Sequence, residues 1–140
     1  MRKLQAGFTL TEILIVVAII GVISAIAFPS YSDHVRKTRR ADAWGAIMGL
    51  ANALERFRAN RGTYAGAAVP AIYPDKSPID GSERYYTLSL SNLAGNTYTI
   101  TATPEGIQKK DSCGRLLLDQ SGTRTAPDAA AGMNDSKCWR

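Results

Sequence analysis

The first apolar stretch of the chain is long and contains very few polar side chains. It extends from Phe8 to Phe28, and its polar members are Thr9, Thr11, Glu12 and Ser24. As a helix it would be about 31 Å long, which matches the hydrocarbon core of one bilayer. A carboxylate in such a segment is unfavourable, by about 2.5–3.5 kcal/mol at the membrane centre and by less near the edge. Glu12 is therefore expected either to lie at the lipid boundary or to have a positively charged partner.

Beyond Phe28 the pattern changes from uniformly apolar to amphipathic. Pro29 follows the apolar run directly, and because proline lacks a backbone N–H it is a weak point for helical continuity and a candidate helix break. Farther along, apolar side chains recur at steps of three and four residues, as on one face of a helix: Trp44, Ile47, Leu50, Ala51, Leu54 and Phe57. Gly62 suits the position just after a helix, so the amphipathic helix is expected to occupy residues 30–61.

The stretch that follows this helix shows no sustained period. Residues 62–84 contain Pro70, Pro74 and Pro78, together with two internal glycines. Such a composition predicts a variable surface loop with at most a short strand or helical turn.

Strand-like alternation begins after this loop. In residues 86–90 and 98–102, apolar side chains alternate with Ser or Thr, which is the period of a half-buried strand. Further strands are expected at 114–118 and 123–125, and a tight turn at 119–122 joins them. The whole pattern predicts an α+β fold, in which a long amino-terminal helix packs on an antiparallel β-sheet.

The two cysteines, Cys113 and Cys138, lie late in the chain. An even number of cysteines in an exported domain predicts a disulfide, here one that ties back an irregular Ala- and Gly-rich segment, residues 126–135. Closing a loop of this length would stabilise the domain by about 3–4 kcal/mol in the chain-entropy model. A metal site would need more ligands, and the one histidine, His34, is distant in sequence.

The residues at the amino terminus have a distinctive order. A short basic leader, Met1-Arg2-Lys3, is followed by Gly7, Phe8 and Glu12 and then by the apolar run. This order closely resembles the amino terminus of type IV pilins. The resemblance implies that a prepilin peptidase removes residues 1–7 by cutting after Gly7, that the new amine of Phe8 is methylated, and that Glu12 is needed for assembly. A charged pair between that amine and Glu12 of a neighbouring subunit would favour one register in a medium of low dielectric constant.

The second half of the chain adds to the resemblance. Paired tyrosines at 85 and 86 precede a Thr-rich strand, Cys113-Gly114 precedes a Leu-rich strand, and Cys138-Trp139 lies near the end. These features resemble the minor pilins of the PilE, PilX and competence-pilin group, PilE most of all. The implied fold is that of type IV pilins: a transmembrane and polymerisation helix over 8–29, a periplasmic head over 30–140, and a disulfide loop within residues 85–140.

The implied function is that of a low-abundance pilin in the type IV pilus. It would help to prime assembly and would support twitching motility and adhesion. The implied partners are other major and minor pilins, the prepilin peptidase, the assembly platform of the inner membrane, and the inner membrane itself. Before assembly the chain would cross that membrane once with its head in the periplasm, and afterwards it would belong to the surface fibre.

An ordinary secretory signal peptide is the competing interpretation of the amino terminus. Ala25-Ile26-Ala27 has the spacing of small residues at a signal cleavage site. Against it, the apolar run exceeds the usual 7–15 residues of such signals, and Glu12 lies near its start. A mature terminus at Phe8 or at Phe28 distinguishes the two.

Charge leaves two further questions open. The formal net charge is +5, and a basic cluster, Arg36, Lys37, Arg39 and Arg40, follows the apolar run on the side expected to be exported. Because the positive-inside rule would keep that side in the cytoplasm, the cluster needs another role. It is expected to meet phospholipid headgroups or acidic neighbours in a filament, and a solvated helix face is the simpler alternative.

The alternatives to a structural minor pilin are a DNA-binding competence pilin and a major pilin or pseudopilin. For DNA, phosphate contacts and one stacking surface would come from Lys109, Lys110, Arg115, Arg124, Lys137 and Arg140 with Trp139. No catalytic residues are expected, because nothing in the pattern orients His34 as a base and no phosphate-binding glycine loop occurs. The sequence therefore predicts neither an enzyme nor a cofactor or metal.

Overall fold

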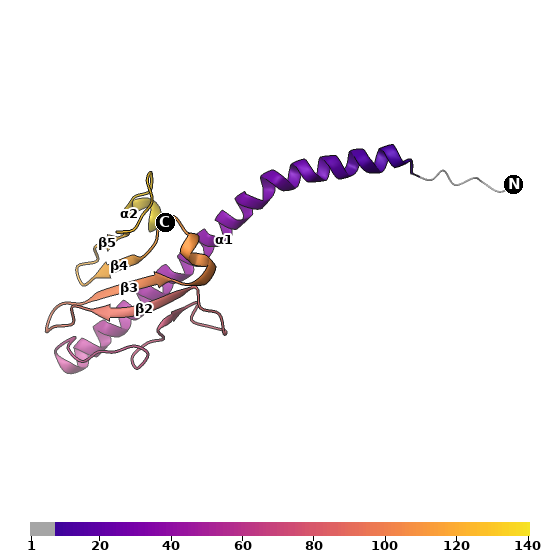
Figure 1. The fold of residues 1–140 in the computed structure, drawn as a ribbon. Coiled ribbons are helices and arrows are strands. Elements are labelled where there is room, and N and C mark those ends of the chain that lie inside the picture. Colours follow the sequence, from indigo (N-terminus) through magenta and orange to yellow (C-terminus); the bar gives the residue numbers. More distant parts are fainter. Residues whose placement is uncertain (1–7) are drawn as a thin grey trace. The chain divides into compact units, whose positions relative to one another are not determined.

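The computed structural model describes residues 8–140 and contains two compact units that meet at Val35 and Arg36. The first unit holds the beginning of helix α1 (Leu10–Arg61), and the second, Arg36–Arg140, holds the rest of α1 and every other element (Figure 1). These other elements are β1 (Lys76–Ser77), β2 (Tyr86–Ser91), β3 (Thr99–Pro104), the 3-10 helix η1 (Gly106–Lys110), β4 (Leu116–Asp119), β5 (Arg124–Thr125) and α2 (Asp135–Cys138). The gross α+β prediction is confirmed.

The five strands form one antiparallel sheet in the order of the sequence, β1-β2-β3-β4-β5. In its centre Leu88 of β2 faces Ala102, and Ile100 of β3 faces Leu118 of β4. Along β3 every second side chain is buried, because successive side chains of a strand point to opposite faces of the sheet. The alternation in the sequence thus selects the face that packs on the helix.

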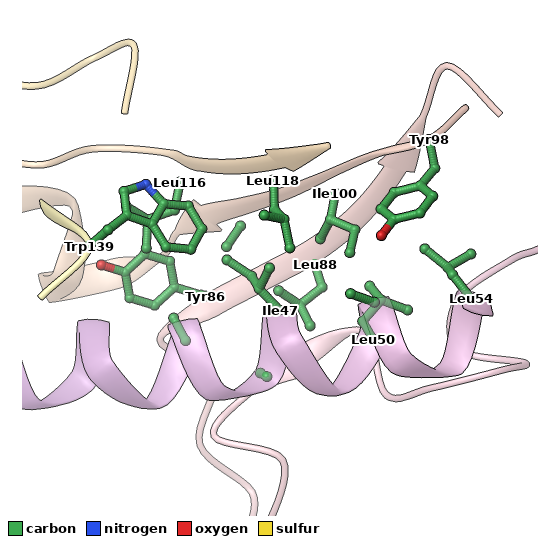
Figure 2. Packing of buried hydrophobic residues seen from close by; sticks show 14 of the residues in the cluster. Ile47, Leu50, Leu54, Tyr86, Leu88, Tyr98, Ile100, Leu116, Leu118 and Trp139 are labelled. Carbon is green, nitrogen blue, oxygen red and sulfur yellow. The ribbon is translucent and has the colours of Figure 1, made fainter. Parts of the chain in front are cut away.

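The core of the head lies between this face and the second part of α1 (Figure 2). Helix residues Ile47, Leu50 and Leu54 are fully buried. They lie opposite Leu88 and Ile100 of the sheet. Each such side chain contributes about 1.5–3 kcal/mol through removal of its apolar surface from water.

Trp44 does not belong to this core, although the sequence pattern placed it there. Its side chain is 36% exposed, whereas Ala43 and Ala46 are buried. The buried stripe is therefore centred on small residues at this end of the helix, and the larger indole lies at the margin.

The loop of residues 62–84 is mostly irregular, as predicted, with the short strand β1 inside it. It is nevertheless packed against the head and is not only a surface connection. Tyr64 is fully buried, with its ring edge-on to Tyr98 at a centroid distance of 4.9 Å. The hydroxyl of Tyr73 lies against Gly49 of α1 so closely that a Cβ there would collide with it. These aromatic anchors hold the loop without regular hydrogen bonding.

Several element boundaries differ from the sequence prediction. Helix α1 is continuous through Pro29 in the isolated chain, and a helix break at this residue in an assembled fibre stays a prediction. The helix ends at Arg61 as predicted, with Gly62 at a φ of 74°. Strand β4 begins at Leu116, two residues later than predicted. The 3-10 helix η1 and the short helix α2 were not predicted at all.

The disulfide between Cys113 and Cys138 is present, with the two Cα atoms 5.6 Å apart. Both cysteines are buried beside Trp139 in the core cluster. The bond joins the segment before β4 to α2 and so closes the irregular carboxyl-terminal loop onto the sheet. This confirms the prediction of a disulfide loop at the end of the chain.

Candidate functional site

The beginning of α1 carries the residues that the sequence connects with assembly. Thr9 precedes the helix, and its hydroxyl oxygen accepts a hydrogen bond from the Glu12 backbone N–H at 3.2 Å. In return Glu12 Oε2 accepts from the Thr9 backbone N–H and from the Thr9 hydroxyl, each at 2.9 Å. This reciprocal arrangement is a capping box, which satisfies N–H groups that the first helical turn leaves unpaired. In the isolated chain, therefore, Glu12 finds uncharged partners within its own first turn.

Gly7, on the other side of the expected cleavage position, lies outside the described residues. Phe8 is described and its side chain is 85% exposed. The roles expected for Gly7 and Phe8 in cleavage, and for Phe8 in methylation, stay predictions. The position just before a capped helix is compatible with access by a peptidase.

The apolar side chains that follow are exposed on every side of the helix. Ile13, Ile15 and Ile23, which lie on different faces, are between 51% and 60% exposed. Among residues 8–140 this is the one helix long and apolar enough to cross a membrane. Such a surface is unfavourable in water, so lipid or other apolar helices have to cover it.

The basic cluster after the apolar run is divided by the fold. Arg40 is 4% exposed and forms a buried ion pair with Asp111, its Nη1 lying 2.6 and 2.8 Å from the two carboxylate oxygens. The Tyr86 hydroxyl donates to the same carboxylate at 3.1 Å, and burial raises the pKa of that phenol. Arg40 is thus a structural residue, which corrects its assignment to an exposed basic cluster.

The six basic residues proposed to bind DNA do not form one surface in the structure. Arg115 is paired with Asp128, its Nε and Nη2 lying 2.6 and 3.0 Å from the carboxylate oxygens. This hydrogen-bonded pair lowers the pKa of Asp128 and raises that of Arg115. Lys109 and Lys110 lie on η1, against the Arg36 end of the head's helix, and not beside β5.

Arg124, on β5, joins two tryptophans that are far apart in sequence. Its guanidinium carbon lies 5.5 Å from the centroid of Trp44 and 5.7 Å from that of Trp139. Within residues 8–140 no carboxylate lies close enough to form an ion pair with it. A guanidinium over an aromatic face is a favourable cation–π contact and stays available to an anion.

Trp139 cannot be the stacking surface that the sequence suggested. Its side chain is only 7% exposed, and its Nε1 donates to the backbone oxygen of Thr125 at 3.2 Å. Trp44 takes this place instead, because it is exposed beside Arg124. The sequence did contain a signal for this. Ala43, one residue before Trp44, falls on the same helix face as Ile47 and Leu50, and it is Ala43 that is buried.

Three comparisons with known proteins place this geometry in a family. The amino-terminal segment, residues 2–28, matches the prokaryotic N-terminal methylation motif. Residues 29–117 match the family described as the type IV minor pilin ComP, DNA uptake sequence receptor. Between them the two family models cover the helix and most of the head.

Individual relatives agree with this assignment. The type IV major fimbrial protein FimA of Dichelobacter nodosus is 31% identical over 137 residues, 98% of this chain and 80% of FimA. The fimbrial protein EcpC of Eikenella corrodens is 32% identical over 107 residues, 74% of this chain and 65% of EcpC, so the chain spans about two thirds of that relative.

A solved structure shares the fold. The crystal structure of the Neisseria meningitidis non-core minor pilin PilV superposes with a TM-score of 0.53 at 21% identity, over 74% of this chain and 95% of PilV. Together with the methylation motif and the capped, membrane-length helix, these matches mean that the chain belongs to the type IV pilin family and carries a ComP-like minor-pilin domain, a structural subunit and not an enzyme.

Proposed function

We propose that this pilin is a minor subunit of a type IV pilus that binds DNA through its head. The observation that carries the proposal is the match of residues 29–117 to a family described as a DNA uptake sequence receptor. A purely structural pilin, as a minor subunit that primes assembly or as a major subunit, is the second candidate, and the similarity to the major fimbrial protein FimA over 98% of the chain favours such a structural role. The two are compatible, because a DNA-binding pilin must also enter the fibre.

Entry into the fibre would use the amino-terminal half of α1. Prepilin peptidase would cut between Gly7 and Phe8, and the chain would wait in the inner membrane with its head in the periplasm. The Phe8 amine of one subunit would then attract Glu12 of the next in surroundings of low dielectric constant. To make this contact Glu12 must give up its hydrogen bonds with Thr9. The exchange is favourable because a hydrogen bond to a charged amine is stronger than one to an uncharged donor.

Glu12→Val tests this part of the proposal. We expect the variant to fold and to insert into the membrane normally, because the Glu12 carboxylate hydrogen-bonds to Thr9 in its own helical turn. Its content in sheared pili, measured by quantitative mass spectrometry against the membrane pool, should fall at least tenfold. Glu12→Asp serves as the matched control that keeps the charge. Equal recovery of wild type and Glu12→Val in pili would contradict the assembly role, and the same spectra report whether Phe8 is the methylated terminus.

The DNA surface that we propose is centred on Arg124 and Trp44. Arg124 offers a charge to a phosphate, and Trp44 offers an exposed aromatic face on which a base can stack. Lys137, on α2, and Arg140, just after it, are exposed. Trp139, which lies between them in sequence, is hydrogen-bonded to the backbone of Thr125 in β5. The surface therefore draws on α1, β5 and the carboxyl terminus, which the disulfide helps to hold together.

Electrophoretic mobility shifts with residues 30–140 test DNA binding. This fragment contains the whole second unit, with all of its core residues. Arg124→Ala should weaken binding several-fold and reduce the slope of log K against log salt by about 1. Trp44→Ala should weaken binding to single-stranded DNA by about tenfold, since stacking contributes about 1–3 kcal/mol per base.

Arg56→Ala is the matched control for these variants, because Arg56 is equally charged and exposed but lies elsewhere on α1. It should leave DNA binding unchanged. Absence of any shift by the wild-type fragment at low salt would refute the DNA-binding function while leaving the assembly role intact.

A further inference from the structure

The 3-10 helix η1 is fixed to the first turn that α1 contributes to the head. Gln108 is fully buried, and its Nε2 donates to the backbone oxygen of Arg36 at 3.0 Å. One residue past η1, Asp111 holds Arg40 in the buried ion pair. The two attachments are one helical turn apart on α1, so η1 lies beside residues 36–40 with little freedom to move away.

The outer side chains of η1 combine charge with an exposed apolar group. Lys109 and Lys110 are exposed, and Ile107 is 61% exposed. Glu105 lies 4.0 Å from Lys109, but both side chains are open to solvent, so this pair is weak. This combination allows the isoleucine to enter an apolar interface while the two lysines reach anionic groups beside it.

The helix beside η1 supplies a further exposed charge. Of the basic cluster, Arg40 is buried and Arg39 lies over the ring of Tyr85, with its guanidinium carbon 3.8 Å from the ring centroid. Lys37 is exposed. The fold therefore removes Arg40 from the surface and holds Arg39 over Tyr85, while η1 adds Lys109 and Lys110 from a distant part of the sequence.

The chain length between this surface and the apolar run suits one occupant. Arg36 follows Phe28 by eight residues, which span about 12 Å as a helix. Headgroups extend about 5–7 Å beyond the hydrocarbon core on each side, and charges act over a further 8 Å or so at physiological salt. A chain anchored by residues 8–28 can thus bring lysines at this level to a headgroup surface.

We propose that η1 and Lys37 form a docking surface for anionic phospholipid headgroups, on which the pilin rests before assembly. Lys37, Lys109 and Lys110 bind lipid phosphates, and Ile107 enters the interface between them. The proposal depends on the membrane anchorage proposed above and is independent of DNA binding. Each lysine near an anionic surface strengthens such a contact by about fivefold.

Photocrosslinking of the full mature chain in nanodiscs tests the surface. Ile107→p-benzoylphenylalanine is compared with the same substitution at Ile79, an exposed isoleucine of the loop after β1. Discs contain phosphatidylcholine alone or with about one third phosphatidylglycerol, and intact mass identifies the adducts. We expect a phosphatidylglycerol adduct at position 107 in the mixed discs, at least fivefold more abundant than at position 79, and its loss in 0.5 M NaCl.

Charge variants separate this contact from chance proximity. Lys109→Gln with Lys110→Gln should reduce the adduct at position 107 at least fivefold. Lys137→Gln with Arg140→Gln, which removes the same charge elsewhere on the head, should leave it unchanged. All four side chains are exposed, so neither pair disturbs the core.

Three outcomes would overturn the proposal. These are equal lipid adducts at positions 107 and 79, an adduct at 107 that does not depend on phosphatidylglycerol, and an adduct with a second copy of the chain in place of lipid. The same probe at Ile19, within the apolar run, separates two kinds of failure. Lipid adducts at Ile19 without any at 107 refute the docking surface alone, whereas their absence at Ile19 also refutes the membrane anchorage.

Discussion

The two halves of helix α1 differ both in how many apolar residues they contain and in how these residues are distributed around the helix. Before Val35 they surround the helix, and side chains such as Ile19 and Ile20 are more than half exposed. After Arg36 they form one stripe, in which Ile47 and Leu50 are fully buried. A stripe can be satisfied by one sheet, whereas a fully apolar surface needs a medium or several neighbours.

The comparison shows where each half obtains its stability. The head buries its stripe within a single chain, so its folding is a property of the isolated molecule. The first half has no internal partner of this kind, so its environment must come from lipid or from other pilins. The two halves of the helix are therefore stabilised by different surroundings. Substitutions in the second half should change the unfolding of the head, and substitutions in the first half should leave it unchanged.

Asp111→Ala should give the largest change in the stability of the head. It leaves Arg40 charged and buried without its partner, which costs about 3–5 kcal/mol. Urea unfolding of the mature chain in detergent, followed by tryptophan fluorescence, measures it, because Trp44 and Trp139 both lie in the head. Asp128→Ala, which removes the exposed ion pair with Arg115, should unfold at the same urea concentration as the wild type. Similar losses in both variants would show that the buried pair has no special role.

Leu50→Ala and Leu14→Ala compare the same substitution in the two halves of α1. Leu50 is fully buried, so its truncation should destabilise the head by about 3 kcal/mol through lost burial and a residual cavity. Leu14 is 60% exposed, and its truncation should leave the fluorescence-detected transition unchanged. A shift of that transition by Leu14→Ala would mean that the first half contributes to the folding of the head.

Thr9→Ala should have the smallest effect, confined to the first turn of α1. Loss of the capping hydroxyl should destabilise that turn by about 1 kcal/mol. Faster hydrogen exchange of the amides of residues 10–13 would report it, with the head unaffected. Thr11→Ala, two residues along in the same exposed segment, is the control. Unchanged exchange in Thr9→Ala would show that the capping box does not stabilise the start of the helix.

The contiguous features of the molecule were predictable from the sequence. The length of the apolar run, the end of α1 at Arg61 and the three longer strands follow from periodicity and from Gly62, because each depends on neighbours in the chain. Two cysteines leave a single intramolecular pairing, so the disulfide was predictable as well. Pro29 lies within the continuous helix, so its role as a helix break in the fibre stays a prediction.

Only the tertiary structure decides which distant side chains meet. Arg40 and Asp111 are 71 residues apart, and no local pattern shows that one basic residue of a cluster turns inward to a carboxylate that follows two lysines. The same holds for Trp44 and Arg124, and for η1 and Arg36. These pairs come together only when the helix packs on the sheet. The sequence alone determined that this is a pilin with a membrane-length apolar helix and a disulfide-closed head. The surfaces on that head arise from packing, because burial and ion pairing depend on distances in space and not along the chain.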